Sequence, residues 1–227
     1  MWCTRALTIH WRSVDKPPMQ PTPNWYERHL LPYLIDFACG IRPVRRQRRK
    51  VVPLASGRVL EIGIGTGLNV PHYDRSRVSG VVGLDPGLQM HPLARKRVNQ
   101  AKLPVELVGL SAEKIPFDDA SFDSVLVTYS LCTIPDPVAA LKEMRRVLKP
   151  AGKLIYCEHG LAPEAAVQKW QRRLNPVWSK LAGGCHLDRD IPDLLRQAGL
   201  RSPDMQTLYL PGPRPLTFNY WGTAEPA

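Results

Sequence analysis

Apolar residues in the middle of the chain form short continuous runs, which alternate with segments of helical spacing. The runs predict five strands: Arg58–Ile62, Gly80–Asp85, Val105–Val108, Phe122–Thr128 and Lys153–Cys157. The segments 86–100 and 137–148 predict helices. Apolar strands that alternate with helices are typical of a parallel sheet covered on both faces. We therefore expect a Rossmann-like, doubly wound α/β fold.

The last third of the chain adds a different pattern. Residues 164–181 and 191–198 have the spacing of helices, and two apolar runs follow at 205–210 and 218–221. A proline-rich segment separates these runs, so we predict two closing strands. No internal repeat is visible. Residues 57–227 are therefore expected to form one domain.

The first quarter of the chain has its own organisation. Residues 1–23 are polar and rich in proline near their end, which predicts a loose arm, with Met19 as an alternative start of the chain. Asn24 suits a helix N-cap. An apolar stripe from Leu30 to Ala38 then predicts a helix, which Pro32 is expected to bend or restart.

A basic run, Arg42–Lys50, follows this helix. The chain has 31 lysines and arginines against 20 acidic residues, a net charge of +11 that suits an anionic partner. No aromatic residue interleaves the run as a base-stacking surface requires, so we expect no nucleic-acid partner. We interpret residues 24–56 as a lid helix with a solvated basic turn. The alternative is that residues 30–50 contact an anionic membrane surface.

The five cysteines of the chain are far apart in sequence. They are Cys3, Cys39, Cys132, Cys157 and Cys185. No metal-ligand spacing is present, so we predict free thiols and no metal site. The sequence contains neither an apolar segment long enough to span a bilayer nor the continuous apolar segment of a signal peptide. We expect a cytoplasmic protein, with membrane contact limited to a peripheral one.

A glycine-rich loop follows the first predicted strand, in the segment Glu61–Gly67. Its glycines are Gly63, Gly65 and Gly67. They permit a tight turn and a close approach of the backbone to a ligand. A dinucleotide loop requires a further small residue where this chain has Leu68, which disfavours NAD. Asp85, at the end of the second predicted strand, can accept hydrogen bonds from ribose hydroxyls, and the charge of Glu61 suits a cationic sulfonium ligand.

With this loop and Asp85, further segments resemble the class I methyltransferases that depend on S-adenosylmethionine (SAM). They are Ser111–Phe117, Ala120–Asp123, Pro135–Pro137 and Glu143–Gly152. The resemblance covers residues from about 58 to 160. It implies SAM as the cofactor and a seven-stranded, mostly parallel sheet with an antiparallel last strand. The implied cofactor contacts are Glu61, Gly63, Gly65, Gly67, Asp85, Pro86, Ser111, Ala112, Glu113 and Thr133.

The methyl acceptor is expected at the ends of the fourth and fifth predicted strands. His159 is the candidate general base there, since histidine titrates near neutral pH; the alternative is a buried histidine bonded to a carbonyl or to Glu158. Cys132 is the second catalytic candidate. Its alternative role is a buried wall residue, because a direct displacement needs no covalent enzyme intermediate.

The segment Gly183–Asp190 also contains residues of chemical interest. Cys185 and His186 would suggest a metal site together with Cys157 and His159. Adjacent Cys-His pairs rarely fit one tetrahedral centre, so we predict instead a substrate-lid loop with the two glycines as hinges.

The downstream motifs are similar to those of one branch of the family. Leu131–Thr133, Glu158–His159, Trp170–Gln171 and Gly184–Leu187 resemble segments of the animal alkyl thiol methyltransferases and their bacterial relatives. This resemblance implies a small thiol or sulfide acceptor. A rival resemblance is to the soluble bacterial phosphatidylethanolamine N-methyltransferases, and a small-molecule O- or N-methyltransferase is a further alternative.

Overall fold

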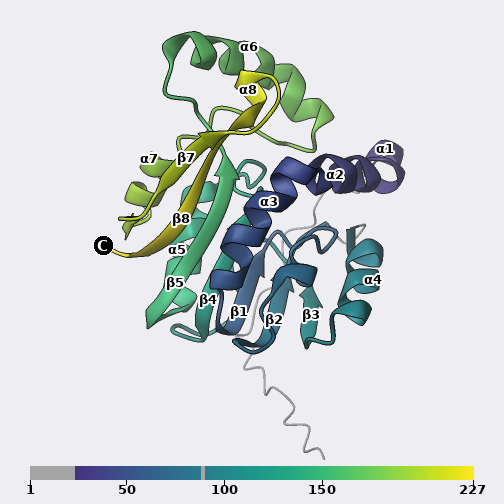
Figure 1. Cartoon of the computed structure of the whole chain (residues 1–227), viewed down its shortest axis with the longest axis vertical. Helices are drawn as coiled ribbons and strands as arrows, with labels where there is room; N and C mark the ends of the chain where they lie inside the picture. Colours follow the sequence, from purple (N-terminus) through teal and green to yellow (C-terminus); the bar gives the residue numbers. More distant parts are fainter. Residues whose placement is uncertain (1–23, 88–89) are drawn as a thin grey trace, which may run out of the picture.

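A single eight-stranded sheet forms the centre of the molecule (Figure 1). The computed structural model describes residues 24–87 and 90–227, so the predicted arm 1–23 and Met19 lie outside the described residues. The strands are β1 (Gly57–Ile62), β2 (Val78–Leu84), β3 (Val105–Val108), β4 (Phe122–Thr128), β5 (Leu148–His159), β6 (Leu200–Arg201), β7 (Gln206–Tyr209) and β8 (Phe218–Pro226). Their order is β3-β2-β1-β4-β5-β8-β6, and β7 also pairs with β8.

The first five strands are parallel, and β8 runs antiparallel to β5. Ile62 of β1 aligns with Leu84 of β2 and with Val127 of β4. These strands therefore end at one common edge. The chain order reverses beside β1, because β2 and β3 lie on one side of it and β4 and β5 on the other. Open α/β sheets bind their ligands at such a switch point, beyond the carboxyl ends of the strands.

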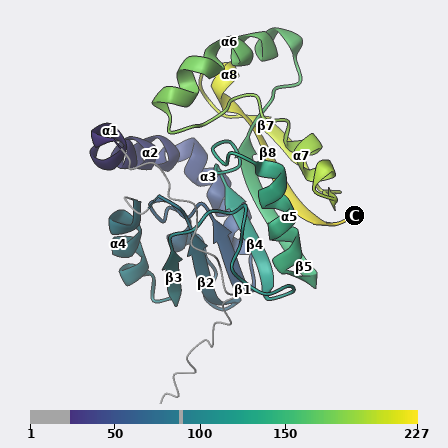
Figure 2. The same ribbon diagram turned by 180° about the vertical axis from the view of Figure 1, so that it is seen from behind.

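Helices cover both faces of the sheet. They are α1 (Trp25–His29), α2 (Leu31–Gly40), α3 (Arg42–Val51), α4 (His91–Ala101), α5 (Pro137–Val147), α6 (Ala165–Leu181), α7 (Ile191–Gln197) and α8 (Arg214–Thr217), with 3-10 turns η1 (Val52–Leu54) and η2 (Val70–His72). Helix α3 lies across one face, whereas α5 and α7 cover the other (Figures 1 and 2). Helices α1, α2, α6 and α8 gather at one end of the sheet.

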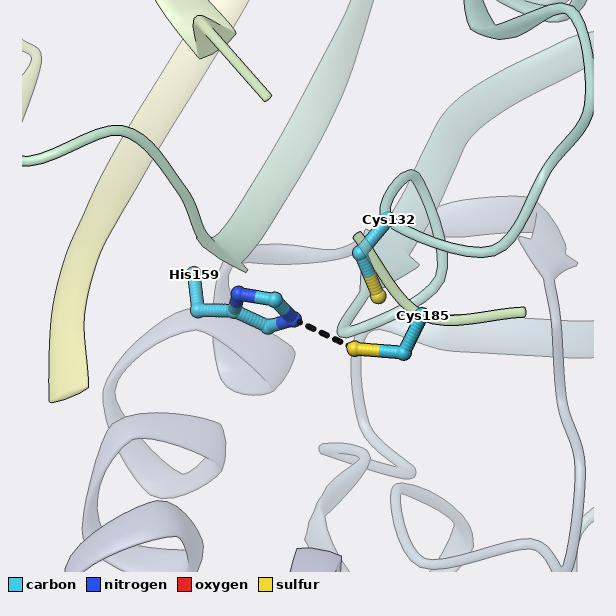
Figure 3. Close-up of side chains that lie close together, drawn as sticks. All are labelled: Cys132, His159 and Cys185. Carbon is cyan, nitrogen blue, oxygen red and sulfur yellow. Dashed lines mark hydrogen bonds between the residues drawn. The ribbon is translucent and has the colours of Figure 1, made fainter. Parts of the chain in front are cut away.

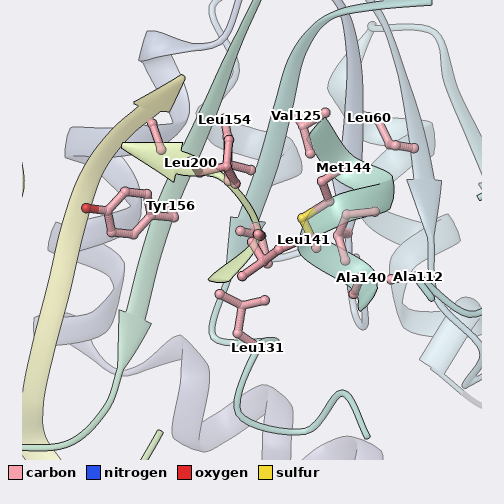
Figure 4. Close-up of a cluster of buried hydrophobic side chains, with 14 of the residues drawn as sticks. Leu60, Ala112, Val125, Leu131, Ala140, Leu141, Met144, Leu154, Tyr156 and Leu200 are labelled. Carbon is pink, nitrogen blue, oxygen red and sulfur yellow. The ribbon is translucent and has the colours of Figure 1, made fainter. Parts of the chain in front are cut away.

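Two apolar clusters stabilise this arrangement, one on each face of the sheet. The larger packs β4 and β5 against α5 and α7, and Figure 4 shows Leu141 and Met144 of α5 against Val125 and Leu154. The smaller contains Val51 at the end of α3 together with residues of β1, β2, β4 and β5. Burial on both faces explains why the central strands are almost continuously apolar.

The predicted α/β architecture is confirmed, including the antiparallel last strand. The sheet has one strand more than the seven implied, because the two-residue β6 also pairs with β8. Asn24 caps α1 by accepting a hydrogen bond from the Glu27 amide, and Glu27 bonds back to Asn24. The predicted restart near Pro32 is also confirmed, since α2 begins at Leu31 with proline in its first turn.

The predicted basic turn is wrong, because residues 42–51 form the helix α3. Val44, Gln47, Arg48 and Val51 are buried on one side of this helix. The other cations of the run remain on its exposed side, so their density concealed an amphipathic helix. Among the helices in the described part of the chain, none is long and apolar enough to cross a bilayer.

Candidate active site

The glycine loop turns at the carboxyl end of β1, directly beside Asp85. The Gly65 amide donates a hydrogen bond of 2.8 Å to Asp85 Oδ2, and the Gly87 amide donates one of 2.7 Å to Asp85 Oδ1. Gly65 has a φ of 52°, and a Cβ added there would meet no atom outside the adjacent residues nearer than Gly63 O at 3.8 Å. The positive φ therefore favours glycine at this turn, which brings the Gly65 backbone to the Asp85 carboxylate, as a nucleoside-binding loop requires.

Glu61 lies behind the loop in a buried polar network. Its carboxylate accepts hydrogen bonds from Tyr73 Oη (2.7 Å) and Asn69 Nδ2 (2.9 Å). Arg48 Nη1 donates to Asn69 Oδ1 (2.7 Å) and Thr128 Oγ1 (2.6 Å). Burial raises the pKa of Glu61 to about 7, although these donors and Arg48 oppose the shift. Asn69, Tyr73 and Arg48 were not predicted as site residues, because their connection depends on packing between distant segments.

The other predicted cofactor contacts lie on neighbouring loops. The Ser111 hydroxyl donates to the Glu113 carboxylate, which also accepts from the Asp136 amide. Ala112, the residue between Ser111 and Glu113 in the chain, is buried. Pro86 is exposed after β2, and the exposed Thr133 donates its hydroxyl to Ser130 O over 2.9 Å. Their contacts with a cofactor stay predictions.

Helix α2 is held against the glycine loop by a polar anchor. Asp36 accepts a hydrogen bond of 2.6 Å from Thr66 Oγ1 and forms an ion pair of 2.7 Å with Arg97 of α4. Arg97 also donates to Thr66 O over 2.7 Å. These bonds keep the pKa of Asp36 below its usual value, although burial raises it. The contacts support the interpretation of α2 as a cover for this edge of the sheet.

Three sulfur and nitrogen side chains meet at the ends of β4 and β5. They are Cys132 after β4, His159 at the end of β5 and Cys185 after α6, and their ligand atoms all lie within 4.8 Å of one another (Figure 3). His159 Nε2 and Cys185 Sγ are 3.1 Å apart. Trp178 Nε1 donates to the same sulfur over 3.2 Å. Both predicted catalytic residues therefore lie together, and Cys185 joins them.

Hydrogen bonds hold the loop that carries Cys185 against neighbouring segments. The His186 amide donates to Cys132 O over 2.9 Å, and the Leu187 amide donates to Asn175 Oδ1 over 2.8 Å. Gly184 has a φ of 87°, which turns the chain after α6 back toward β5. The loop predicted as a lid thus forms one wall of the cluster.

The cluster stabilises negative charge on Cys185. A hydrogen bond from Cys132, with further contributions from His159 and Trp178, lowers the pKa of the Cys185 thiol despite its burial. The same hydrogen bond, together with burial, raises the pKa of Cys132. Burial would lower the pKa of His159, but its contact with Cys185 raises it overall. Negative charge in this cluster is therefore favoured on Cys185 rather than on Cys132.

Cys157 and His186 do not join this cluster. Cys157 Sγ lies 3.5 Å from Tyr129 Oη within the apolar face beneath α3, and His186 Nδ1 lies 3.1 Å from Asn175 Nδ2. The adjacent Glu158 is fully buried and accepts the Ser130 amide at 2.8 Å. Of the four residues weighed from the sequence as a metal set, His159 and Cys185 therefore lie together, whereas Cys157 and His186 lie elsewhere.

Comparisons with known proteins agree with this geometry. A family model described as a methyltransferase domain matches residues 60–156. The chain is 37% identical over 143 residues to a phosphatidylethanolamine N-methyltransferase of Cereibacter sphaeroides, covering 60% of this chain and 70% of the relative. It is 33% identical over 135 residues to the thiol S-methyltransferase TMT1B of Rattus norvegicus, covering 58% of this chain and only 55% of the relative.

The fold is also similar to solved structures. A SAM-dependent methyltransferase from Thermotoga maritima superimposes with a TM-score of 0.61 and 26% identity, over 87% of this chain and 97% of the other.

Proposed function

Because this chain belongs to the class I SAM-dependent methyltransferases, we propose that it methylates the sulfur of a small thiol or sulfide. The chain is a SAM-dependent enzyme of this family. Its relatives include methyltransferases for different acceptors, one for a phospholipid amine and one for thiols. The choice of acceptor therefore has to come from the residues of the site itself.

The loop at Gly65 and the carboxylate of Asp85 are proposed to hold the nucleoside part of SAM. Because Gly65 has no Cβ, a ligand can approach its backbone closely at this place beside Asp85. Asp85 already orders the loop through the Gly65 amide, and each carboxylate oxygen has capacity to accept a ribose hydroxyl as well. Ser111, Ala112 and Glu113 are proposed for the adenine side.

The observation that carries the acceptor proposal is the sulfur-stabilising cluster at the ends of β4 and β5. Ser130, two residues before Cys132, donates its hydroxyl to Gly63 O over 3.4 Å, so the cluster is adjacent to the cofactor loop. Trp178 Nε1 donates a hydrogen bond to Cys185 Sγ, and His159 Nε2 lies 3.1 Å from the same sulfur. Polar groups of this kind, gathered beside the cofactor loop, would stabilise the thiolate of an acceptor that approaches the methyl group.

SAM supplies an electrophilic methyl group on a sulfonium sulfur. The protein's task is to align the acceptor and to exclude water, because opposite charges cancel as a thiolate attacks a sulfonium. Leu131 and Cys132, which follow β4, are buried and would help to exclude water from this end of the sheet. An amine acceptor would leave a cation, yet the carboxylate of Glu158, next to His159 in the chain, accepts the Ser130 amide.

The test compares acceptors that differ only in the reacting atom. A thiol, an alcohol and an amine with one carbon skeleton are incubated with labelled SAM and the full chain. We expect transfer to the thiol at least about tenfold faster than to the other two, a difference of about 1.4 kcal/mol in the barrier. Faster transfer to the amine or alcohol would reverse the assignment.

A second candidate is a lipid acceptor, which an exposed apolar surface favours. Trp25, Tyr33 and Phe37 of α1 and α2 are 69%, 63% and 77% exposed. Phe37 also borders a groove of about 550 Å³ lined by Arg45 and Arg49 among others. We propose that this surface contacts anionic lipid, since exposed aromatic rings beside cations suit a membrane interface.

Vesicle sedimentation tests the second candidate. We expect the chain to sediment with anionic but not with zwitterionic vesicles, and the Phe37→Ser variant to bind at least about fivefold more weakly. Leu54→Ser is the control, because Leu54 is also exposed but lies on η1. Equal binding of both vesicle types, or equal losses in both variants, would contradict the proposal.

A further inference from the structure

The Cys-His cluster has the composition and the spacing of a zinc site. We propose that Cys132, His159 and Cys185 bind one zinc ion and leave its fourth position for the sulfur of the acceptor. The inference rests on the proposed thiol methylation, and it gives the three side chains a common chemical role. The sequence predicted no metal here, because Cys132 and Cys185 are 53 positions apart and show no ligand spacing.

The geometry requires only small movements to accept the ion. Zinc–sulfur bonds of about 2.3 Å and zinc–nitrogen bonds of about 2.0 Å place tetrahedral ligand atoms roughly 3.5–3.8 Å apart. His159 Nε2 and Cys185 Sγ are now 3.1 Å apart, and all three ligand atoms lie within 4.8 Å of one another. Changes of about 1 Å or less, within the reach of side-chain rotation, would therefore complete the site. In residues 24–87 and 90–227 this is the one group of three such ligands.

The charge and the surroundings of the cluster also suit zinc. Two thiolates and a neutral imidazole balance the charge of the ion, which matters because Cys132 is buried. The Trp178 indole N–H donates to Cys185 Sγ and would orient that ligand through this hydrogen bond. The bond from the His186 amide to Cys132 O fixes the two cysteine-bearing loops to each other. Soft sulfur ligands favour zinc over magnesium or calcium.

Three protein ligands are typical of a zinc site that keeps an open position for water or substrate. An acceptor thiol that binds there loses its proton to solvent, because coordination deprotonates a thiol. Its lone pair then forms the new S–CH₃ bond while the sulfonium S–CH₃ bond breaks. The released electron pair stays on the departing sulfur, giving a thioether and S-adenosylhomocysteine. His159 acts here as a ligand in place of its predicted role as a free base.

Metal titration of the full chain tests the site. Under reducing conditions and in competition with a chromophoric chelator, we expect one zinc ion per chain. Cys185→Ser and His159→Ala should weaken zinc binding by on the order of 100-fold or more. Loss of a ligand should cost at least as much as loss of a group that only hydrogen-bonds a ligand. Cys157→Ser is the matched control, because that thiol is buried but bonded to Tyr129. Binding of no zinc, or equal binding in all variants, would overturn the proposal.

Cobalt replaces zinc in a second measurement that needs no variant. The unaltered chain with one equivalent of cobalt(II) should show an intense thiolate-to-cobalt absorption band, which changes when a small thiol is added. A spectrum without that band would overturn the metal site. A band that does not change when the thiol is added would overturn the fourth coordination position as the acceptor's binding place. Stoichiometric zinc without thiol methylation would refute only the proposed function, whereas thiol methylation by a chain that binds no zinc would refute only the metal site.

Discussion

Arg48 lies in the basic run but belongs to the interior of the protein. The side chain is 6% exposed, and Nη1 donates to Asn69 Oδ1 and Thr128 Oγ1 at 2.7 and 2.6 Å. The guanidinium also lies 5.1 Å from the centre of the Tyr129 ring. Replacing Arg48 with alanine removes all three interactions and leaves two buried polar groups without this donor.

The expected loss follows from these contacts. Hydrogen bonds that involve a charged group contribute about 1.5–3 kcal/mol each, so two of them represent about 3–6 kcal/mol. Removing a buried cation also relieves a desolvation cost, and Nε of Arg48 has no hydrogen-bond partner. We therefore expect Arg48→Ala to lower the free energy of unfolding by about 2–4 kcal/mol, or the Tm by about 6–12 °C.

Urea denaturation of two variants provides the assay. Arg49→Ala is the control, because Arg49 is the next residue of α3 and is exposed, so its loss should change stability by less than about 0.5 kcal/mol. Similar losses in both variants would refute the assignment of Arg48 to the interior network. The loss of stability in Arg48→Lys should lie between the losses in the two alanine variants, since lysine keeps the charge but lacks the planar guanidinium with its several donors.

Three further predictions concern the cofactor loop and its network. Gly65→Ala should lose the Tm increase caused by SAM, because a φ of 52° disfavours alanine and the new Cβ would stand where the ligand approaches the backbone; an unchanged increase would argue against a ligand there. Asp85→Ala should weaken SAM binding by at least about 30-fold in calorimetry, the loss expected for one hydrogen bond of about 2 kcal/mol to a charged group; normal affinity would remove its ribose role. Glu61 has a folded-state pKa of about 7 against 4.5 for the ordinary carboxyl, so the folded state keeps a proton that the unfolded chain releases, and stability falls as pH rises between these values. Glu61→Gln should therefore gain about 3 kcal/mol relative to the unaltered chain between pH 4.5 and pH 8 in urea denaturation, and a constant difference would contradict the shift.

The sheet could be predicted from the sequence because its strands are apolar on both faces. The bounds of β3 and β4 agree with the prediction, whereas β5 begins at Leu148 rather than at Lys153. The extra residues include Pro150 and Gly152, which are rare within strands and concealed the early start.

Helix α3 was missed because its charges outweighed a weaker signal. Val44, Gln47, Arg48 and Val51 recur at the three- and four-residue spacing of one helix face. Two of these four residues are polar, so a pattern based on hydrophobicity alone does not find them. The neutral partners of Arg48 are Asn69, just before η2, and Thr128 of β4, and only the folded chain brings them together.

The proximity of Gly65 to Asp85 followed from local sequence, as did the position of Cys132 and His159 at strand ends, whereas the position of Cys185 did not. Gly65 and Asp85 follow two adjacent strands, β1 and β2, so their proximity could be predicted. His159 and Cys185 are 26 positions apart, and they meet because the turn at Gly184 directs the loop after α6 toward β5. Neither the spacing of these residues nor their hydrophobic pattern encodes that turn.

Transfer of labelled methyl from SAM, measured side by side on a small thiol and on phosphatidylethanolamine vesicles, tests the central proposal most directly. Asp85→Ala serves as the control that ties transfer to the cofactor loop. The account predicts a labelled thioether formed from the thiol, in a reaction that Asp85→Ala slows by at least about 30-fold at limiting SAM. Label that enters only the lipid, with none in the thiol, would contradict it.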